Sequence, residues 1–362
     1  MMRGYNFGAG PATLPESILQ EAQAELLNWH ESGMSILEIG HRTELFKDLL
    51  NQAELLLREL LSIPNNYHVL FLTSPARTQF AMIPMNLIGR SEQAGYLISG
   101  VWSKLAYEEA CQLSHAYCIA DNVNSDYWQL PVYGLEDIRD ETAYVYYTSN
   151  ETIQGLRFPE PLTDIQVPLV VDMTSSILSE PIAVDDYGLI FAGAQKNIGP
   201  AGLTIVIMRE DLLKEPLHPL PTMLNYQTFI DTQSLYATPA TFQCYMAYKM
   251  FQWVKSQGGV DTLYQNNIKK AKKLYDYIDA SSAYQCHIAK NARSLMNVCF
   301  SLIDPTQEEA FLKQANQRGL YALKGHRLVG GLRASLYNAM PMAGVEALIT
   351  FMQDFSVGRG DD

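Results

Sequence analysis

The chain has 362 residues, of which 48% are apolar, and a formal net charge of -13. This composition is typical of a globular protein with one large core or two domains, and no apolar run reaches the roughly 18 residues of a membrane span. An acidic chain without a Lys/Arg-rich run repels phosphate backbones, so we expect no membrane segment and no nucleic-acid partner.

Short apolar runs alternate with amphipathic helical patterns through the first two-thirds of the chain. The predicted helices are residues 17–29, 44–61 and 103–113. The predicted strands are residues 69–72, 96–98, 116–119, 144–147, 169–172, 189–192 and 203–208. Alternation of this kind predicts an α/β fold around a mainly parallel sheet.

The pattern changes after about residue 235. Two long helices are predicted at residues 241–256 and 261–280, with Gly258-Gly259 as a stop signal between them. The remainder alternates strand, helix, strand and helix, at residues 296–301, 306–318, 332–335 and 344–353. This predicts a small α+β domain after a boundary near residue 255.

Several common motifs are absent from the sequence. No GxGxxG, GxxxxGK[ST], HExxH or GxSxG occurs, which argues against the usual dinucleotide, P-loop, zinc-protease and hydrolase classes. The five cysteines are scattered without a CxxC pair, so we expect reduced thiols in a cytoplasmic protein and no metal site. No apolar stretch follows Arg3, so we expect no secretory leader.

Two polar residues follow apolar strands. Lys196 lies in a tight Gly/Pro-rich turn between two strands, and Asp172 ends the strand before them. Taken alone, a surface lysine and a turn aspartate are the simpler explanations. Together they suit pyridoxal phosphate (PLP), because a lysine amine can form a Schiff base and an aspartate can keep the pyridine nitrogen protonated.

Five segments, in one order along the chain, resemble the phosphoserine aminotransferase family. They are Asn6-Phe-Gly-Ala-Gly-Pro-Ala, His41-Arg42, Asn150-Glu-Thr, Gly193-Ala-Gln-Lys-Asn-Ile-Gly-Pro-Ala-Gly and Gly325-His-Arg-Leu-Val-Gly-Gly-Leu-Arg-Ala-Ser. The resemblance implies a PLP-dependent transferase of fold type I. Its large domain, residues 15–255, would carry a mainly parallel seven-stranded sheet, and residues 1–14 and 256–362 would form the small α+β domain.

The family's activity is amino-group exchange between L-glutamate and 3-phosphohydroxypyruvate, which gives 2-oxoglutarate and O-phospho-L-serine. A related step in pyridoxine biosynthesis forms 4-phosphohydroxy-L-threonine. Members of the family form homodimers with shared active sites, so the resemblance implies the same assembly for this chain. It also implies that the substrates are small molecules.

The resemblance also assigns roles to individual residues. Lys196 matches the Schiff-base lysine and Asp172 the partner of the pyridine nitrogen. Trp102 matches the aromatic that stacks on the cofactor ring, although a core tryptophan at a helix start is the simpler explanation from the sequence alone. The other cofactor contacts are Ala76, Arg77, Thr152, Gln195 and, from the second subunit, Thr238.

Substrate anions need local cations, because the protein as a whole is acidic. Arg333 matches the arginine that binds the α-carboxylate, where a planar guanidinium suits bidentate binding. Two His-Arg pairs match the pocket for the distal phosphate or carboxylate: His41 and Arg42 from the second subunit, and His326 and Arg327.

Two positions depart from the family pattern. Ser74-Pro75 stands in a phosphate loop that is usually glycine-rich, and Pro75 removes one N–H and restricts Ser74. We expect phosphate binding to survive on the amides that follow. Ala237 replaces an asparagine, which removes a hydrogen bond worth about 1 kcal/mol.

Two other functions remain open. One is another PLP enzyme on the same scaffold, of the alanine–glyoxylate aminotransferase or cysteine desulfurase type, although no cysteine lies in an obvious mobile loop. The other is a dimer that binds PLP weakly and has no enzymatic role. A substrate panel and the visible absorption of PLP would separate these from the first hypothesis.

Overall fold

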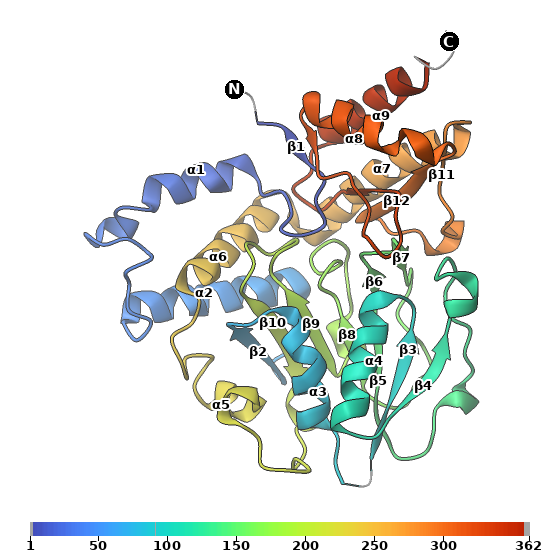
Figure 1. Cartoon of the computed structure of the whole chain (residues 1–362). Helices are drawn as coiled ribbons and strands as arrows, with labels where there is room; N and C mark the ends of the chain where they lie inside the picture. The colour runs from blue at the N-terminus through green and yellow to red at the C-terminus, as the bar shows by residue number, and fades with distance from the viewer. Residues whose placement is uncertain (1–2, 91, 358–362) are drawn as a thin grey trace.

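The computed structural model describes residues 3–90 and 92–357, and its centre is a seven-stranded sheet in the order β2-β10-β9-β8-β5-β3-β4 (Figure 1). β10 is antiparallel to both of its neighbours, and every other adjacent pair is parallel. The mainly parallel seven-stranded sheet is therefore confirmed. The strands are β2 (Tyr67–Leu72), β3 (Gln93–Ile98), β4 (Ala116–Asp121), β5 (Thr142–Thr148), β8 (Leu169–Asp172), β9 (Leu189–Gly193) and β10 (Thr204–Arg209).

Helices cover both faces of this sheet because its strands are apolar on both sides. In β5, Tyr144 and Tyr146 pack into one apolar cluster, and Val145 and Tyr147 pack into another. Side chains alternate between the faces of a strand, so each face buries its own set. One cluster includes α3 (Gln79–Leu87) and α4 (Val101–Leu113), and the other includes α1 (Glu16–Glu25), α2 (Glu44–Leu61) and α6 (Thr241–Ser256). The short α5 (Tyr226–Asp231) packs beside β2.

A smaller layer lies above the carboxyl ends of the parallel strands (Figure 1). It contains an antiparallel sheet, β11-β12-β14, and a parallel pair, β1-β13. Its elements are β1 (Tyr5–Asn6), α7 (Gly259–Ala280), β11 (Tyr284–Gln285), β12 (Asn297–Leu302), α8 (Glu308–Gln317), β13 (Leu320–Tyr321), β14 (Leu332–Ser335) and α9 (Met342–Val357). Phe7 shares a separate apolar cluster with residues of α7, α8 and α9. This separate cluster supports the two-domain division, which stays a proposal.

Some local elements differ from the sequence-based expectation. α1 ends at Glu25 rather than near Trp29, and Trp29 is buried in a short 3₁₀ turn instead. α3 was not predicted, because Pro84 inside it is a residue that usually breaks helices. A two-stranded hairpin of β6 (Asn150–Glu151) and β7 (Leu156–Arg157) was also missed, since strands of two residues have no periodicity.

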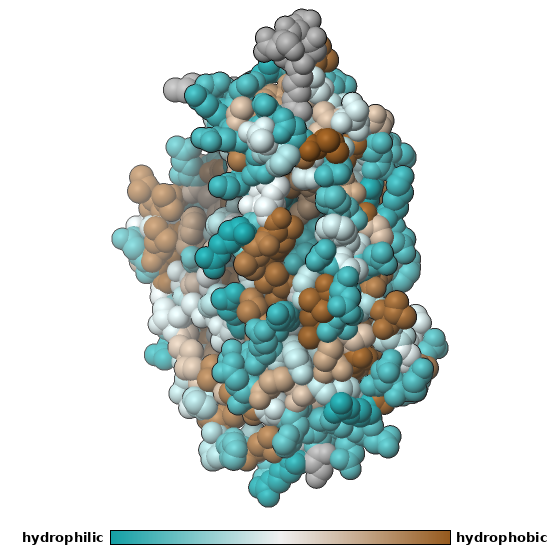
Figure 2. Space-filling model, turned by 45° about the vertical axis from the view of Figure 1, so that its right-hand side comes forward, coloured by the Kyte–Doolittle hydropathy of each residue, from teal (hydrophilic) through white to brown (hydrophobic). Residues whose placement is uncertain are grey.

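The surface mixes hydrophilic and hydrophobic residues. The face in Figure 2 is largely hydrophilic, with hydrophobic residues gathered near its middle and at its upper left edge. None of the helices in residues 3–90 and 92–357 is both long enough and apolar enough to cross a membrane.

Candidate active site

The predicted site residues gather at the carboxyl edge of the large sheet. Asp172 is the last residue of β8, and Lys196 follows β9 after two residues. Trp102 lies in the first turn of α4, which follows β3. These side chains line one cavity of about 550 Å³. Ligands bind at this edge of open α/β sheets, so the cavity is the leading candidate for the active site.

Lys196 is buried in this cavity, and its Nζ donates a hydrogen bond to Thr152 Oγ1. Burial lowers the pKa of the Lys196 amine to about 8, because a desolvated ammonium is disfavoured. The charge of Asp172 opposes this shift, and the charge of Arg333 adds to it. Roughly a tenth of Lys196 is therefore a neutral, nucleophilic amine at pH 7, far more than for a lysine with the ordinary pKa of 10.5.

Asp172 is a buried carboxyl group with few compensating donors. Its Oδ1 accepts a hydrogen bond of 2.8 Å from the backbone amide of Thr174. Burial raises the pKa of Asp172, while the hydrogen bonds from Thr174 and the charge of Lys196 oppose the rise. A buried carboxylate of this kind favours a cationic partner, such as a protonated ring nitrogen.

Trp102 presents a flat apolar wall to the cavity, and the guanidinium of Arg77 lies 5.4 Å from its ring centre. The indole Nε1 is buried and has no hydrogen-bond partner among the described residues. The place of Trp102 in the wall is suited to stacking on an aromatic ligand.

The loop with Pro75 forms the start of a helix rather than a glycine-rich turn. Pro75 has an extended backbone (φ -66°, ψ 149°) and precedes a 3₁₀ turn, Ala76–Thr78, that leads into α3. The first amides of such a turn lack acceptors within the helix and can bind phosphate oxygens. The wall of the Lys196 cavity beside this turn is formed by Ala76, Arg77 and Gln195. The buried Ser74 Oγ, just before Pro75, lacks a hydrogen-bond partner among the described residues.

Arg333 and His326 come from the small layer and close the cavity from the opposite side. Arg333 Nη1 donates to the carbonyl oxygen of Thr152 at 3.4 Å, so its guanidinium lies beside the Lys196–Thr152 pair. Burial lowers the pKa of His326, and the charges of Arg333 and Arg327 lower it further. Arg333 therefore supplies a cation on this side of the Lys196 amine, and the lowered pKa of His326 favours its neutral form.

Comparison with known proteins shows which family the chain belongs to. The model of class-V aminotransferases matches residues 4–348. The chain belongs to the class-V aminotransferase family. It is 58% identical to the phosphoserine aminotransferase of Legionella pneumophila (strain Corby), over 99% of both chains. It superposes with TM-score 0.95 on the phosphoserine aminotransferase of Bacillus circulans subsp. alkalophilus, at 44% identity over 99% of both chains.

A PLP-bound phosphoserine aminotransferase from Trichomonas vaginalis superposes with TM-score 0.93, at 38% identity over 97% of this chain and all of that one. The cavity of this class-V aminotransferase suits such a cofactor. Asp172 offers a carboxylate to a ring cation, Trp102 offers a flat face, and the turn at Ala76 offers amides to a phosphate.

Four of the predicted site residues do not line the Lys196 cavity of this chain. Arg42, Arg327 and Thr238 are exposed, and His41 is half-buried with no partner for its buried Nε2 among the described residues. Thr238 lies with Ala237 and Ser74 beside a separate cavity of about 140 Å³. The single chain therefore does not bring these four residues to the amine.

The structure adds residues that the sequence analysis did not assign. Ser175 Oγ accepts from Thr152 Oγ1 at 3.1 Å and donates to the carbonyl oxygen of Asn150 at 2.6 Å. Asn150 Nδ2 in turn donates to Asn297 Oδ1 at 2.8 Å. This buried chain orients the hydroxyl that faces Lys196. The run Met173-Thr-Ser-Ser directly after Asp172 was the available signal for part of it.

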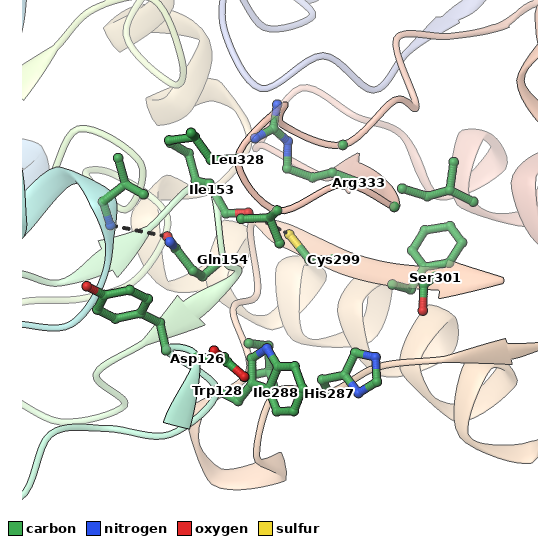
Figure 3. A pocket seen from close by; sticks show the side chains of 18 of the residues that line it. Asp126, Trp128, Ile153, Gln154, His287, Ile288, Cys299, Ser301, Leu328 and Arg333 are labelled. Carbon is green, nitrogen blue, oxygen red and sulfur yellow. Dashed lines mark hydrogen bonds between the residues drawn. The ribbon is translucent and has the colours of Figure 1, made fainter. Parts of the chain in front are cut away.

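A second cavity, of about 680 Å³, adjoins the first and shares Ile153 and Arg333 with it. Figure 3 shows Arg333 on one side of this space and Trp128 with His287 on the other. The rings of Trp128 and His287 are stacked, with centres 4.5 Å apart. Arg333 therefore lies between the Lys196 cavity and this outer space.

We expect the reactivity of Lys196 toward an aldehyde to rise with pH around a midpoint near 8, rather than near the ordinary lysine pKa of 10.5. Only the neutral amine attacks a carbonyl, and a lowered pKa exposes it at lower pH. The rate of PLP capture by the cofactor-free chain, followed by absorption between pH 6 and 10, measures this. A midpoint above 10 would contradict the burial argument, and Lys196→Ala is the control for other lysines.

Proposed function

We propose that this chain is a PLP-dependent phosphoserine aminotransferase. It would exchange the amino group between L-glutamate and 3-phosphohydroxypyruvate and form 2-oxoglutarate and O-phospho-L-serine. One observation carries the proposal: a single cavity combines the Lys196 amine, the buried Asp172 carboxyl group and the Arg333 guanidinium. The full-length relatives named phosphoserine aminotransferase support the choice of substrate.

PLP, when bound, supplies an aldehyde carbon that takes up the amino group and a ring that accepts electrons from the substrate Cα. Lys196 holds the cofactor between turnovers and, once freed, moves the proton at the substrate Cα. Asp172 keeps a positive charge on the ring nitrogen. Trp102 packs against the ring, and the turn at Ala76 with Gln195 binds the phosphate.

Arg333 binds the α-carboxylate that both amino-acid substrates share, since its planar guanidinium can donate two parallel hydrogen bonds. We assign the distal phosphate or carboxylate to His326 and Arg327, together with the partner's His41 and Arg42. A second copy would also supply Thr238. The position of His41, Arg42 and Thr238 away from the Lys196 cavity of their own chain supports a homodimer with shared sites.

The finer assignments rest on composition and resemblance. We propose a cytoplasmic location, which the unpaired cysteines support. We also propose activity in pyridoxine biosynthesis, toward the precursor of 4-phosphohydroxy-L-threonine. That substrate shares the α-carboxylate and distal phosphate for which the site has cations.

We expect the PLP-loaded protein to convert O-phospho-L-serine and 2-oxoglutarate into glutamate. A coupled glutamate assay measures the overall exchange, and loss of the PLP absorption band on adding phosphoserine alone measures the first half-reaction. L-Alanine with glyoxylate is the control substrate pair. Exchange with alanine and glyoxylate but none with phosphoserine would refute the proposal in favour of another aminotransferase.

A further inference from the structure

Glu151 is a fully buried carboxyl group that the proposed reaction does not use. It lies in β6, next to Thr152, and contacts the start of α4. Its Oε2 accepts from the amide of Trp102 at 3.0 Å. Its Oε1 accepts from the amide of Ser103 at 2.9 Å and from Ser103 Oγ at 2.7 Å.

These contacts satisfy helix amides that have no acceptor within α4. The amide of Val101 points to Gln154 Oε1 at 3.5 Å, the bond dashed beside Gln154 in Figure 3. An acidic side chain is favoured at a helix N-terminus, where the partial charge is positive. The hairpin of β6 and β7 therefore supplies acceptors to three successive residues at the start of α4.

Gly100 allows the hairpin to approach this closely. A Cβ atom at position 100 would lie 2.5 Å from Glu151 Cδ and 2.8 Å from Gln154 Oε1. Carbon atoms of real side chains do not come this near, so any larger residue would displace the Glu151 carboxyl group. The absence of a side chain at Gly100 and the acceptors of Glu151 and Gln154 thus both suit the contact between the hairpin and the start of α4.

The ionisation of Glu151 fits the same contact. Burial raises the pKa of Glu151 to about 7, while the Ser103 hydroxyl and the amides of Ser103 and Trp102 oppose the rise. The carboxylate, which is the form that accepts all three hydrogen bonds, therefore predominates above a pH of about 7.

We propose that Glu151 is a positioning residue that fixes the Trp102 ring at the cofactor face. This inference rests on the proposed function. Thr152, the next residue in the hairpin, accepts the hydrogen bond from Lys196 Nζ. One short hairpin thus sets the distance between the aromatic wall and the amine that holds the cofactor.

The test compares Glu151→Gln with Ser103→Ala. Glutamine keeps the shape of Glu151 but replaces one acceptor oxygen with an NH₂ group, which cannot accept from the Trp102 or Ser103 amide. Ser103→Ala removes the hydroxyl that also accepts from the amides of Ser99 and Gly100, at 2.9 and 3.1 Å. It therefore loosens the same helix start but leaves the bond between Glu151 and the Trp102 amide.

We expect Glu151→Gln to weaken PLP binding about tenfold, as the loss of one charged hydrogen bond implies. The circular dichroism of the bound cofactor should also weaken, and the first-turn amides of α4 should exchange faster in the cofactor-free chain. Ser103→Ala should speed exchange but change the PLP Kd by less than about twofold.

An unchanged PLP Kd in Glu151→Gln would overturn the proposal, and so would equal losses in both variants. If Glu151→Gln does not fold, Gly100→Ala is tested instead. It should weaken PLP binding in the same way, because its Cβ atom would displace the Glu151 carboxyl group. A wild-type chain that binds PLP but does not transaminate refutes the proposed function alone, since PLP affinity and amide exchange still report on Glu151. A wild-type chain that binds no PLP overturns both.

Discussion

Lys196→Ala is expected to lower turnover with phosphoserine and 2-oxoglutarate by at least about 10³-fold, because one residue both anchors the cofactor and moves the proton. Proton transfer by a positioned side chain contributes roughly 10²–10⁴-fold on its own. Lys196 is the only lysine among the described residues that line the cavity, so no neighbour can replace it. The overall exchange assay measures the loss.

Lys104→Ala is the matched control, since Lys104 lies on α4 and its side chain is about half exposed. It should keep the wild-type rate. A small primary amine added to Lys196→Ala should restore part of the proton transfer, because it can enter the space left by the side chain. Turnover of Lys196→Ala within tenfold of wild type would overturn the assignment of Lys196.

Two of the predicted site residues that line one cavity stand at or just after strand ends. Asp172 ends one apolar run and Lys196 follows another. The strand character of both runs is clear from local composition, and parallel strands bring their carboxyl ends to one edge. Position along the chain therefore predicted position in space. The same argument does not reach Trp102, Arg333 or His326, whose roles the family resemblance supplied.

The contacts that the sequence could not predict join segments far apart in the chain. The bond between Glu151 and the Trp102 amide spans 49 residues, and that between Asn150 and Asn297 spans 147. Local periodicity carries no information on such pairs. The hairpin of β6 and β7 is also too short for a period-two pattern, so its capping of α4 became visible only in three dimensions.

The position of Pro75 agrees with the expectation that phosphate binding survives on the amides that follow it. Pro75 takes the residue position before the 3₁₀ turn, where its missing N–H costs nothing within the helix. The amides of Ala76 and Arg77 follow it at the edge of the cavity. The departure at Ala237 differs, because that residue lies away from the Lys196 cavity of its own chain.

Asp172→Asn is expected to lower turnover by about 10²–10³-fold, comparable to the loss of one preorganised electrostatic contact in other active sites. Asparagine keeps the shape of Asp172 and can still accept from the Thr174 amide, but its neutral amide cannot hold a proton on the ring nitrogen. Steady-state turnover and the absorption of the bound cofactor measure the two effects.

A cofactor analogue with a methylated ring nitrogen separates charge from shape in Asp172→Asn. The analogue carries its positive charge without a proton, so it should restore a large part of the lost turnover in Asp172→Asn and give no gain in the wild-type chain. Lys196→Ala loaded with the same analogue should stay inactive, since its defect lies in the amine. Equal turnover of Asp172→Asn with PLP and with the analogue would show that Asp172 acts through packing and not through the charge that its burial and its place beside Lys196 imply.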